Sequence, residues 1–115
     1  MTAESLTLLL GDAQPEVISS LSLEYVQVVV QVTAGPNLYD PTGDEVQFAF
    51  VNGSAYPANW YTGSWTTNLQ GSYIAECLVG PAGTITLAPA IWTVWVKITD
   101  DPEIPVRTAG TVTIT

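Results

Sequence analysis

The stretch "EYVQVVVQVT", residues 24–33, decides the fold class of this chain. Every second residue from Val26 to Val32 is a valine, and Gln27, Val29 and Gln31 lie between them. Because successive side chains of a β-strand point to opposite faces, this alternation predicts a strand with one buried valine face. The opposite face, which begins with Tyr25, is mixed in character.

Four further stretches alternate in the same way and are predicted to be strands: residues 45–51, 71–80, 91–99 and 110–115. Shorter candidate strands cover residues 5–10, 59–67 and 83–88. The side chains expected to face inward are Val46, Phe48, Phe50, Tyr73, Ala75, Cys77, Val79, Trp92, Val94, Val96, Ile98, Val112 and Ile114. Together these runs indicate seven or eight short β-strands.

Glycine- and proline-rich segments separate the predicted strands, as turns do. A long connection is expected over residues 34–45, and one short helical turn is expected with Pro15 at its first position. The pattern predicts an all-β protein, an antiparallel β-sandwich of seven to eight strands, with an immunoglobulin-like arrangement as first choice. A tryptophan, Trp60 or Trp65, is expected to fill the centre between the sheets.

The composition fits one domain with a poorly charged surface. The chain has 115 residues, of which 47% are hydrophobic and 11% are charged. Soluble domains usually carry about 25% charged residues. A surface so poor in charge is either covered by neighbouring protein or rich in threonine and serine, and the composition leaves both alternatives open.

The charge balance excludes two classes of partner. The chain has eleven acidic residues, two basic residues and a net charge of −9. Nucleic acids and anionic membranes are bound through clusters of lysine and arginine, so neither is expected to bind this chain. The N-terminal residues lack the basic region of a signal peptide. We therefore expect synthesis in a cytoplasm, with a basic protein surface as a suitable partner.

The residue types needed for most catalysis are missing. There is no histidine, and the single cysteine, Cys77, therefore has no histidine to act as its base. The acidic residues fall in predicted turns such as "DPTGDE" (residues 40–45) and "TDDPE" (residues 99–103), which could offer oxygen ligands to calcium only if the loops meet. Turn formation explains them better. We expect no enzymatic activity and no catalytic, cofactor-binding or metal-binding residues.

Aromatic residues and the two cations mark candidate interaction sites. The segment "YPANWYTGSW", residues 56–65, contains two tyrosines and two tryptophans, and Trp95 is predicted to face outward. Such rings form core, protein interface or a sugar-stacking platform. Lys97 and Arg107 flank an acidic turn in a predicted hairpin, and the final threonines suit an edge strand open to pairing. The candidate interface residues are Trp60, Tyr61, Trp65, Trp95, Lys97 and Arg107.

Several motifs resemble a family. The stretches "LYDPTGDEVQFAFV", "WYTGSW", "GSYIAECLVGPAGT" and "WTVWVKITDDPEIPVRTAGTVTIT", within residues 38–115, are similar to small virion proteins of tailed bacteriophages, especially those infecting actinobacteria. The resemblance implies an immunoglobulin-like domain in the virion, assembled in the host cytoplasm. Residues 38–115 would form the main body, and residues 1–37 would add N-terminal strands and a candidate arm to the same domain. No catalytic residue comes with the resemblance.

These observations predict a structural virion protein, most simply a capsid decoration or minor capsid protein. Its partners would be other virion proteins, namely major capsid or neck subunits, and further copies of the chain. A head–tail connector or a tail or baseplate accessory protein is the alternative site on the particle. A carbohydrate-binding module for host attachment is the alternative of another class. Exposed, coplanar rings at Trp60, Tyr61 and Trp65 would favour that module, and burial of the rings would count against it.

Overall fold

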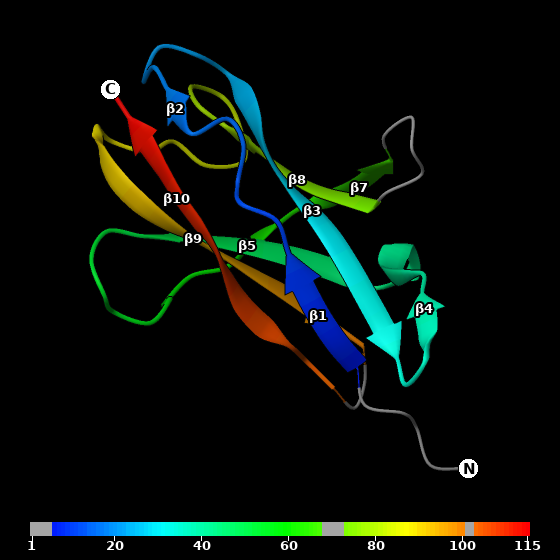
Figure 1. Ribbon diagram of the computed structural model, residues 1–115. Coiled ribbons are helices and arrows are strands. Elements are labelled where there is room, and N and C mark those ends of the chain that lie inside the picture. The colour runs from blue at the N-terminus through cyan, green and yellow to red at the C-terminus, as the bar shows by residue number, and fades with distance from the viewer. Residues whose placement is uncertain (1–5, 68–72, 101–102) are drawn as a thin grey trace.

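The protein folds as two β-sheets packed face to face, which confirms the predicted all-β sandwich (Figure 1). The computed structural model describes residues 6–67, 73–100 and 103–115. Ten strands and one short 3-10 turn, η1, lie within these ranges. Their bounds are β1 Leu6–Leu10, β2 Val17–Ile18, β3 Glu24–Ala34, β4 Asn37–Tyr39, η1 Pro41–Gly43, β5 Glu45–Val51, β6 Tyr61–Thr62, β7 Ser64–Thr67, β8 Tyr73–Val79, β9 Ala90–Thr99 and β10 Val106–Ile114.

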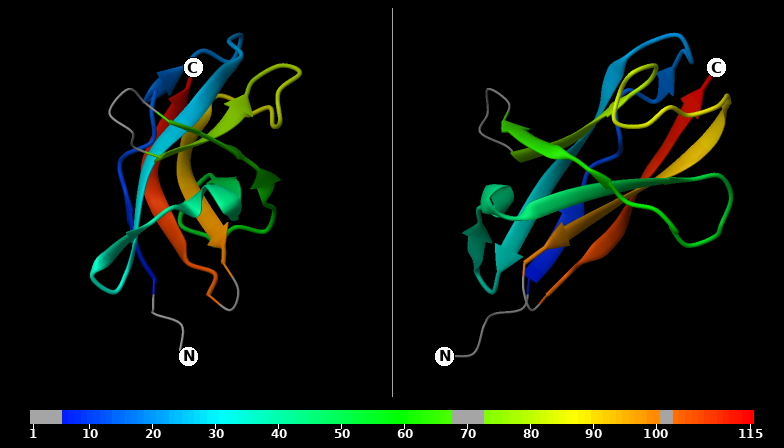
Figure 2. Two further views of the ribbon diagram at one scale, coloured as in Figure 1. Left: turned by 90° about the vertical axis from the view of Figure 1, so that its right-hand side faces the viewer. Right: turned by 180° about the vertical axis from the view of Figure 1, so that it is seen from behind.

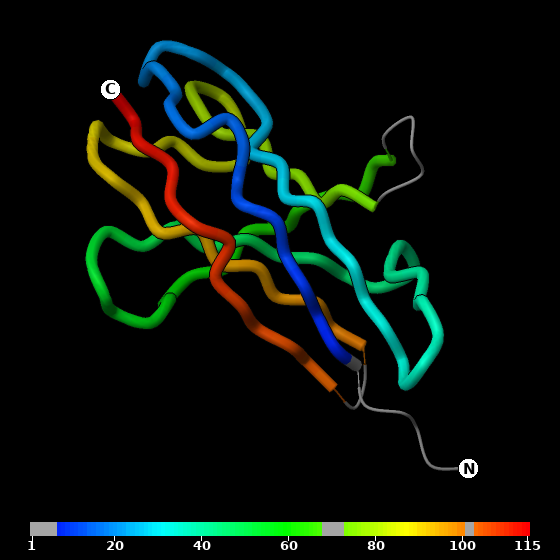
Figure 3. The backbone as a smooth tube through the Cα atoms, viewed as in Figure 1, coloured from blue at the N-terminus to red at the C-terminus, as the bar shows by residue number. Residues whose placement is uncertain are grey.

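The chain alternates between two five-stranded sheets. Sheet A has the order β1-β3-β8-β7, with β4 also paired to β3, and sheet B has the order β2-β10-β9-β5-β6. The described strand pairs are antiparallel except for β2, which pairs with β10 in parallel. Figure 2 shows the two layers edge-on. In Figure 3 the N-terminal segment passes from beside β3 to beside β10, so it contributes to both sheets.

The core lies between the inner faces of the sheets. The valines of β3 that alternate from Val26 to Val32 are buried, as are nearly all the side chains predicted to face inward from β5, β8, β9 and β10. Only Tyr73 and Trp92 of those predicted residues are half-buried. Each fully buried aliphatic or aromatic side chain contributes about 1.5–3 kcal/mol relative to an exposed one. The alternation in the sequence therefore identified the core.

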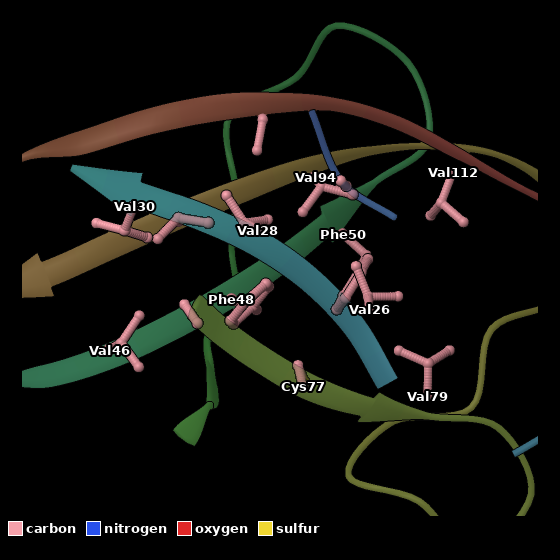
Figure 4. Close-up of a cluster of buried hydrophobic side chains, with 14 of the residues drawn as sticks. Val26, Val28, Val30, Val46, Phe48, Phe50, Cys77, Val79, Val94 and Val112 are labelled. Atoms are coloured by element: carbon pink, nitrogen blue, oxygen red, sulfur yellow. The ribbon is translucent and has the colours of Figure 1, made fainter. Parts of the chain in front are cut away.

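Phe48, and not a tryptophan, fills the centre between the sheets. Its ring is fully buried and stacks with Phe50 at a centroid distance of 6.3 Å (Figure 4). Trp65 lies on β7 at the edge of sheet A, where its Nε1 donates to the carbonyl oxygen of Asp44 at 2.9 Å. Trp60 is only half-buried. The prediction of a central tryptophan was wrong because an indole N–H needs a hydrogen-bond acceptor, which the apolar centre does not supply.

Two local predictions were also wrong, and a third was incomplete. Residues 83–88 do not form a strand, because the chain turns sharply after β8 at Gly80 (φ 133°) and Ala82 (φ 64°), leaving one isolated bridge between Val79 and Ile85. Pro15 does not begin a helical turn but follows a cis peptide bond and leads into β2. The connection over residues 34–45 contains β4 and η1.

The last strand is not the free edge that its threonines suggested. β10 lies between β9 and β2, and Thr113 and Ile114 are paired with the two residues of β2. Ala13 N–H also donates to the Ala109 carbonyl oxygen at 2.7 Å. The N-terminal segment therefore covers the C-terminal half of the strand. Protecting an edge in this way reduces its capacity to pair with another chain.

Candidate interaction surfaces

An aromatic cluster lies on the outer face of sheet B. We define it as Tyr56, Trp60, Trp95 and Lys97. Trp95 points outward from β9, as predicted, and its ring meets Tyr56 of the β5–β6 loop at a centroid distance of 6.0 Å and an angle of 62°. Lys97 Nζ lies 4.4 Å from the centroid of the Trp60 ring. These contacts hold the loop against the sheet.

Two details show how closely the aromatic cluster covers sheet B. Ala49 lies directly opposite Trp95 in the β5–β9 pair and is only 1% exposed, although it belongs to the outer face. The Trp95 Nε1 atom is buried and has no hydrogen-bond partner within the described residues. A buried donor without a partner costs about 1–3 kcal/mol. Trp95 therefore covers the outer face of sheet B around Ala49 and carries one unsatisfied polar group, while Tyr56 at the rim of the cluster stays largely exposed.

The six candidate interface residues do not form one surface. Tyr61 lies opposite Phe48, and both Tyr61 and Trp65 pack against the main core. Lys97 lies opposite Val106 on the outer face of sheet B, whereas Arg107 lies opposite the buried Val96. Because successive side chains of a strand alternate between faces, the β9–β10 hairpin places its two cations on opposite faces of the sheet.

The arrangement of the rings counts against the predicted sugar platform. An exposed platform needs Trp60, Tyr61 and Trp65 on one solvent-facing plane. Two of these rings turn inward, and Trp60 packs with Lys97. The three rings therefore offer no common stacking surface.

A second surface lies on the outer side of sheet A. We call it the apolar face and define it as Leu9, Tyr25, Val29, Ile74 and Leu78. Val29 lies opposite Ile74, and Tyr25 lies opposite Leu78. Val29 and Tyr25 are 46% and 47% exposed, and Leu9 on the adjoining β1 is also exposed. Between these apolar pairs, Gln27 Nε2 donates to Glu76 Oε2 at 2.8 Å.

The apolar face carries no cation, because both basic residues of the chain lie on sheet B. The outer side of β3 is mixed in the sequence, and none of its residues was among the predicted interface residues. The signal was present, since the outward positions of residues 24–33 and 71–80 both contain apolar side chains. What was missing was the strand register, which brings Val29 beside Ile74.

Acidic groups from two loops meet at one end of the sandwich. The Tyr39 hydroxyl donates to Asp44 Oδ2 at 2.9 Å and to Asp100 Oδ1 at 3.4 Å. Burial raises the pKa of Asp44, and burial together with the Asp44 hydrogen bond raises the pKa of Tyr39 to about 12. Thr42 donates both its hydroxyl and its N–H to Asp40, and these bonds lower the pKa of that carboxyl.

The acidic end supplies no recognisable metal site. Within residues 6–67, 73–100 and 103–115, no three histidine, cysteine, aspartate or glutamate side chains lie close enough together to hold a metal ion. Asp101 of the "TDDPE" turn lies outside the described residues. Asp40 serves as the cap of η1, in keeping with the turn role expected from the sequence.

Cys77 offers no reactive thiol in the folded protein. The side chain is buried, and burial raises its pKa to about 11. A thiol must lose its proton to act as a nucleophile, so this residue is a packing group. The described part of the chain also contains no helix long and apolar enough to cross a membrane.

Comparison of the chain with protein-family models, with curated proteins and with solved structures finds no match. The surfaces of the protein, and the resemblance of residues 38–115 to phage virion proteins, are therefore what indicate its function.

Proposed function

We propose that this protein is a structural, non-enzymatic component of a tailed-phage virion that docks on a neighbouring subunit through its apolar face. Capsid decoration is the role that we favour. The resemblance of residues 38–115 supports the particle context. The exposed apolar side chains of sheet A support the mode of binding and carry the proposal.

We further propose that the sandwich is immunoglobulin-like. In that fold one sheet has the strand order A-B-E-D and the other contains G-F-C. The order β1-β3-β8-β7 fits the first sheet, and β10-β9-β5 fits the second. The conserved disulfide of antibody domains has no counterpart, since the chain has one cysteine. The buried Phe48 and Phe50 supply the central packing instead.

The apolar face has the composition of a docking surface. Interface centres combine apolar side chains with few charges, and tyrosine is common among the residues that contribute most binding energy. Leu9, Tyr25 and Val29 provide such a surface on the adjacent strands β1 and β3, with Ile74 and Leu78 of β8 beside them. Gln27 and Glu76 are already hydrogen-bonded to each other, so covering them need not leave the amide donor unpaired.

The charge of the chain indicates which partner suits this face. Copies of a protein with net charge −9 repel one another, and the apolar face holds Glu76 but no cation to offset that repulsion. A neighbouring protein with apolar side chains surrounded by lysine or arginine is complementary to it. We therefore propose a basic capsid surface as the partner, rather than a second copy of this chain.

A binding experiment with particles that lack the protein tests this function. The purified chain is mixed with such particles, and the bound amount is measured by co-sedimentation. Val29→Lys places a cation at the centre of the apolar face, so we expect at least about a tenfold loss of affinity. Ile91→Lys is the matched control, because Ile91 is 61% exposed and belongs to sheet B.

Two outcomes would overturn the proposal. If the wild-type protein does not bind the particles, the proposed virion function is excluded. If Val29→Lys and Ile91→Lys lose equal amounts of affinity, the apolar face is not the docking surface. Binding at many equivalent positions supports decoration, whereas occupancy of a single vertex would replace it with the head–tail connector.

A further inference from the structure

A small hollow opens in the loop between β5 and β6. It encloses about 230 Å³. Its lining includes Asn52, Tyr56, Asn59 and Tyr61. The right-hand view of Figure 2 shows this long loop projecting beyond the end of β5. We propose that the hollow binds a neutral saccharide, with Tyr56 as the stacking residue and the two asparagines as hydrogen-bonding residues.

The Tyr56 ring is suited to stacking. Its side chain is 85% exposed, although one part of the ring contacts Trp95. The apolar C–H groups on one face of a sugar ring pack well against an aromatic ring, which carries negative charge density on its face. Because Trp95 lies on β9 in the middle of sheet B, it holds Tyr56 in place before a ligand arrives. Pre-positioning of this kind reduces the entropy lost on binding.

The asparagines supply the polar contacts that sugar hydroxyls require. Asn52 and Asn59 are both exposed, and they line the same hollow from the two ends of the loop. Each side-chain amide both donates and accepts hydrogen bonds, which matches a hydroxyl group that does the same. The Tyr61 hydroxyl offers one further donor and acceptor.

The lining selects against charged ligands. The lining contains no acidic or basic side chain, so a phosphate, carboxylate or ammonium group finds no opposite charge in the hollow. The net charge of −9 also repels anionic polysaccharides. An uncharged sugar ring, apolar on its faces and hydroxylated at its edge, is the ligand class that remains compatible with an aromatic ring and two amides.

This site is separate from the apolar face, although it shares Tyr56 with the aromatic cluster. The apolar face belongs to sheet A, whereas the hollow lies beside β5 of sheet B, so docking and sugar binding can succeed or fail independently. The hollow shares Tyr56 and Tyr61 with the aromatic segment, residues 56–65, from which a sugar platform was predicted. Trp60 and Trp65 do not line it.

Titration of the full chain with uncharged sugars tests the inference. The probes are glucose, galactose, mannose, N-acetylglucosamine and a trisaccharide of each, detected by saturation-transfer NMR. We expect at least one to bind with a Kd of about 1 mM or below, and Tyr56→Ala to weaken that binding by at least about tenfold. Asn59→Ala is expected to weaken it severalfold.

The control variant is Tyr25→Ala, which removes an exposed tyrosine from the apolar face and should leave sugar binding unchanged. Denaturation curves confirm that each variant is folded. No saturation transfer from any of these sugars at about 20 mM, well above a weak Kd, would overturn the inference. So would unchanged binding by Tyr56→Ala, or a preference for sialylated sugars over neutral ones.

Discussion

Lys97 Nζ lies 4.4 Å from the centroid of the Trp60 ring, and this contact joins the C-terminal part of β9 to the end of the β5–β6 loop. Cations are attracted to the negatively charged face of an aromatic ring. One of the only two basic side chains in the protein therefore serves an internal contact. The other, Arg107, is exposed on the opposite side of the β9–β10 hairpin and donates from Nη1 to the carbonyl oxygen of Val106.

Replacing Lys97 should cost more stability than replacing Arg107. Lys97→Met keeps most of the alkyl chain but removes the charge over Trp60, so we expect a loss of about 0.5–1 kcal/mol in the free energy of unfolding. Arg107→Met is the matched variant and should lose less, since its side chain makes an exposed hydrogen bond within its own strand. Urea denaturation of both proteins measures the difference, and equal losses would contradict this role for Lys97.

The hydroxyl of Tyr39 should stabilise the protein in a pH-dependent way. Tyr39→Phe removes the donor to Asp44 and Asp100, and a hydrogen bond to a charged group contributes about 1.5–3 kcal/mol when it is well shielded. Because this end of the sandwich is partly open to solvent, we expect a loss of about 1 kcal/mol at neutral pH.

The pH dependence follows from Asp44. Burial raises the pKa of its carboxyl in the folded state, so the stabilising effect of its protonation is present at low pH and is lost as the pH rises through that raised value. The Tyr39 hydrogen bond opposes this by favouring the ionised form. Without the bond the pKa of Asp44 should rise further. The difference in free energy of unfolding between the wild type and Tyr39→Phe should therefore narrow as the pH falls from about 7 to about 4. A gap that stays constant in urea denaturation over this range would exclude the mechanism.

Gly80 should tolerate no side chain. Its φ angle is 133°, and a Cβ atom there would collide with the backbone carbonyl of Ser22. Since the obstacle is backbone and cannot rotate away, Gly80→Ala should lose at least about 2 kcal/mol in the free energy of unfolding. Gly43→Ala is the control, because a Cβ atom at that position meets no other atom within 4 Å. Similar stabilities of the two variants, measured by thermal and urea denaturation, would show that the turn after β8 can adapt.

The alternation of side chains was sufficient to predict the sandwich and its inner faces. Val26, Val94 and Val112 lie where a two-residue period places them, because one face of each strand must be buried. Strands β2, β4 and β6 are too short for a period to be visible, since each has two or three residues. They depend on pairing with longer strands, which local sequence does not encode.

The surfaces were harder to predict because they depend on register and loop path. The position of Val29 beside Ile74 requires the pairing of β3 with β8. The position of Tyr56 against Trp95 requires the loop to fold back over sheet B. Tyr39 and Asp100 are 61 residues apart in the sequence, and their hydrogen bond brings the two acidic loops together. The sequence suggested that these loops could meet, but it did not indicate that Tyr39 would join them.

Docking of the apolar face of sheet A on another virion protein is the part of the proposed function that can be tested most directly. Hydroxyl-radical footprinting, read by mass spectrometry, compares the exposure of individual side chains in the free and particle-bound protein. We expect Leu9, Tyr25 and Val29 to become protected on binding, while Ile91 and Tyr56 keep their reactivity. Protection of Ile91 and Tyr56 with Tyr25 and Val29 unchanged would contradict the claim and assign docking to sheet B.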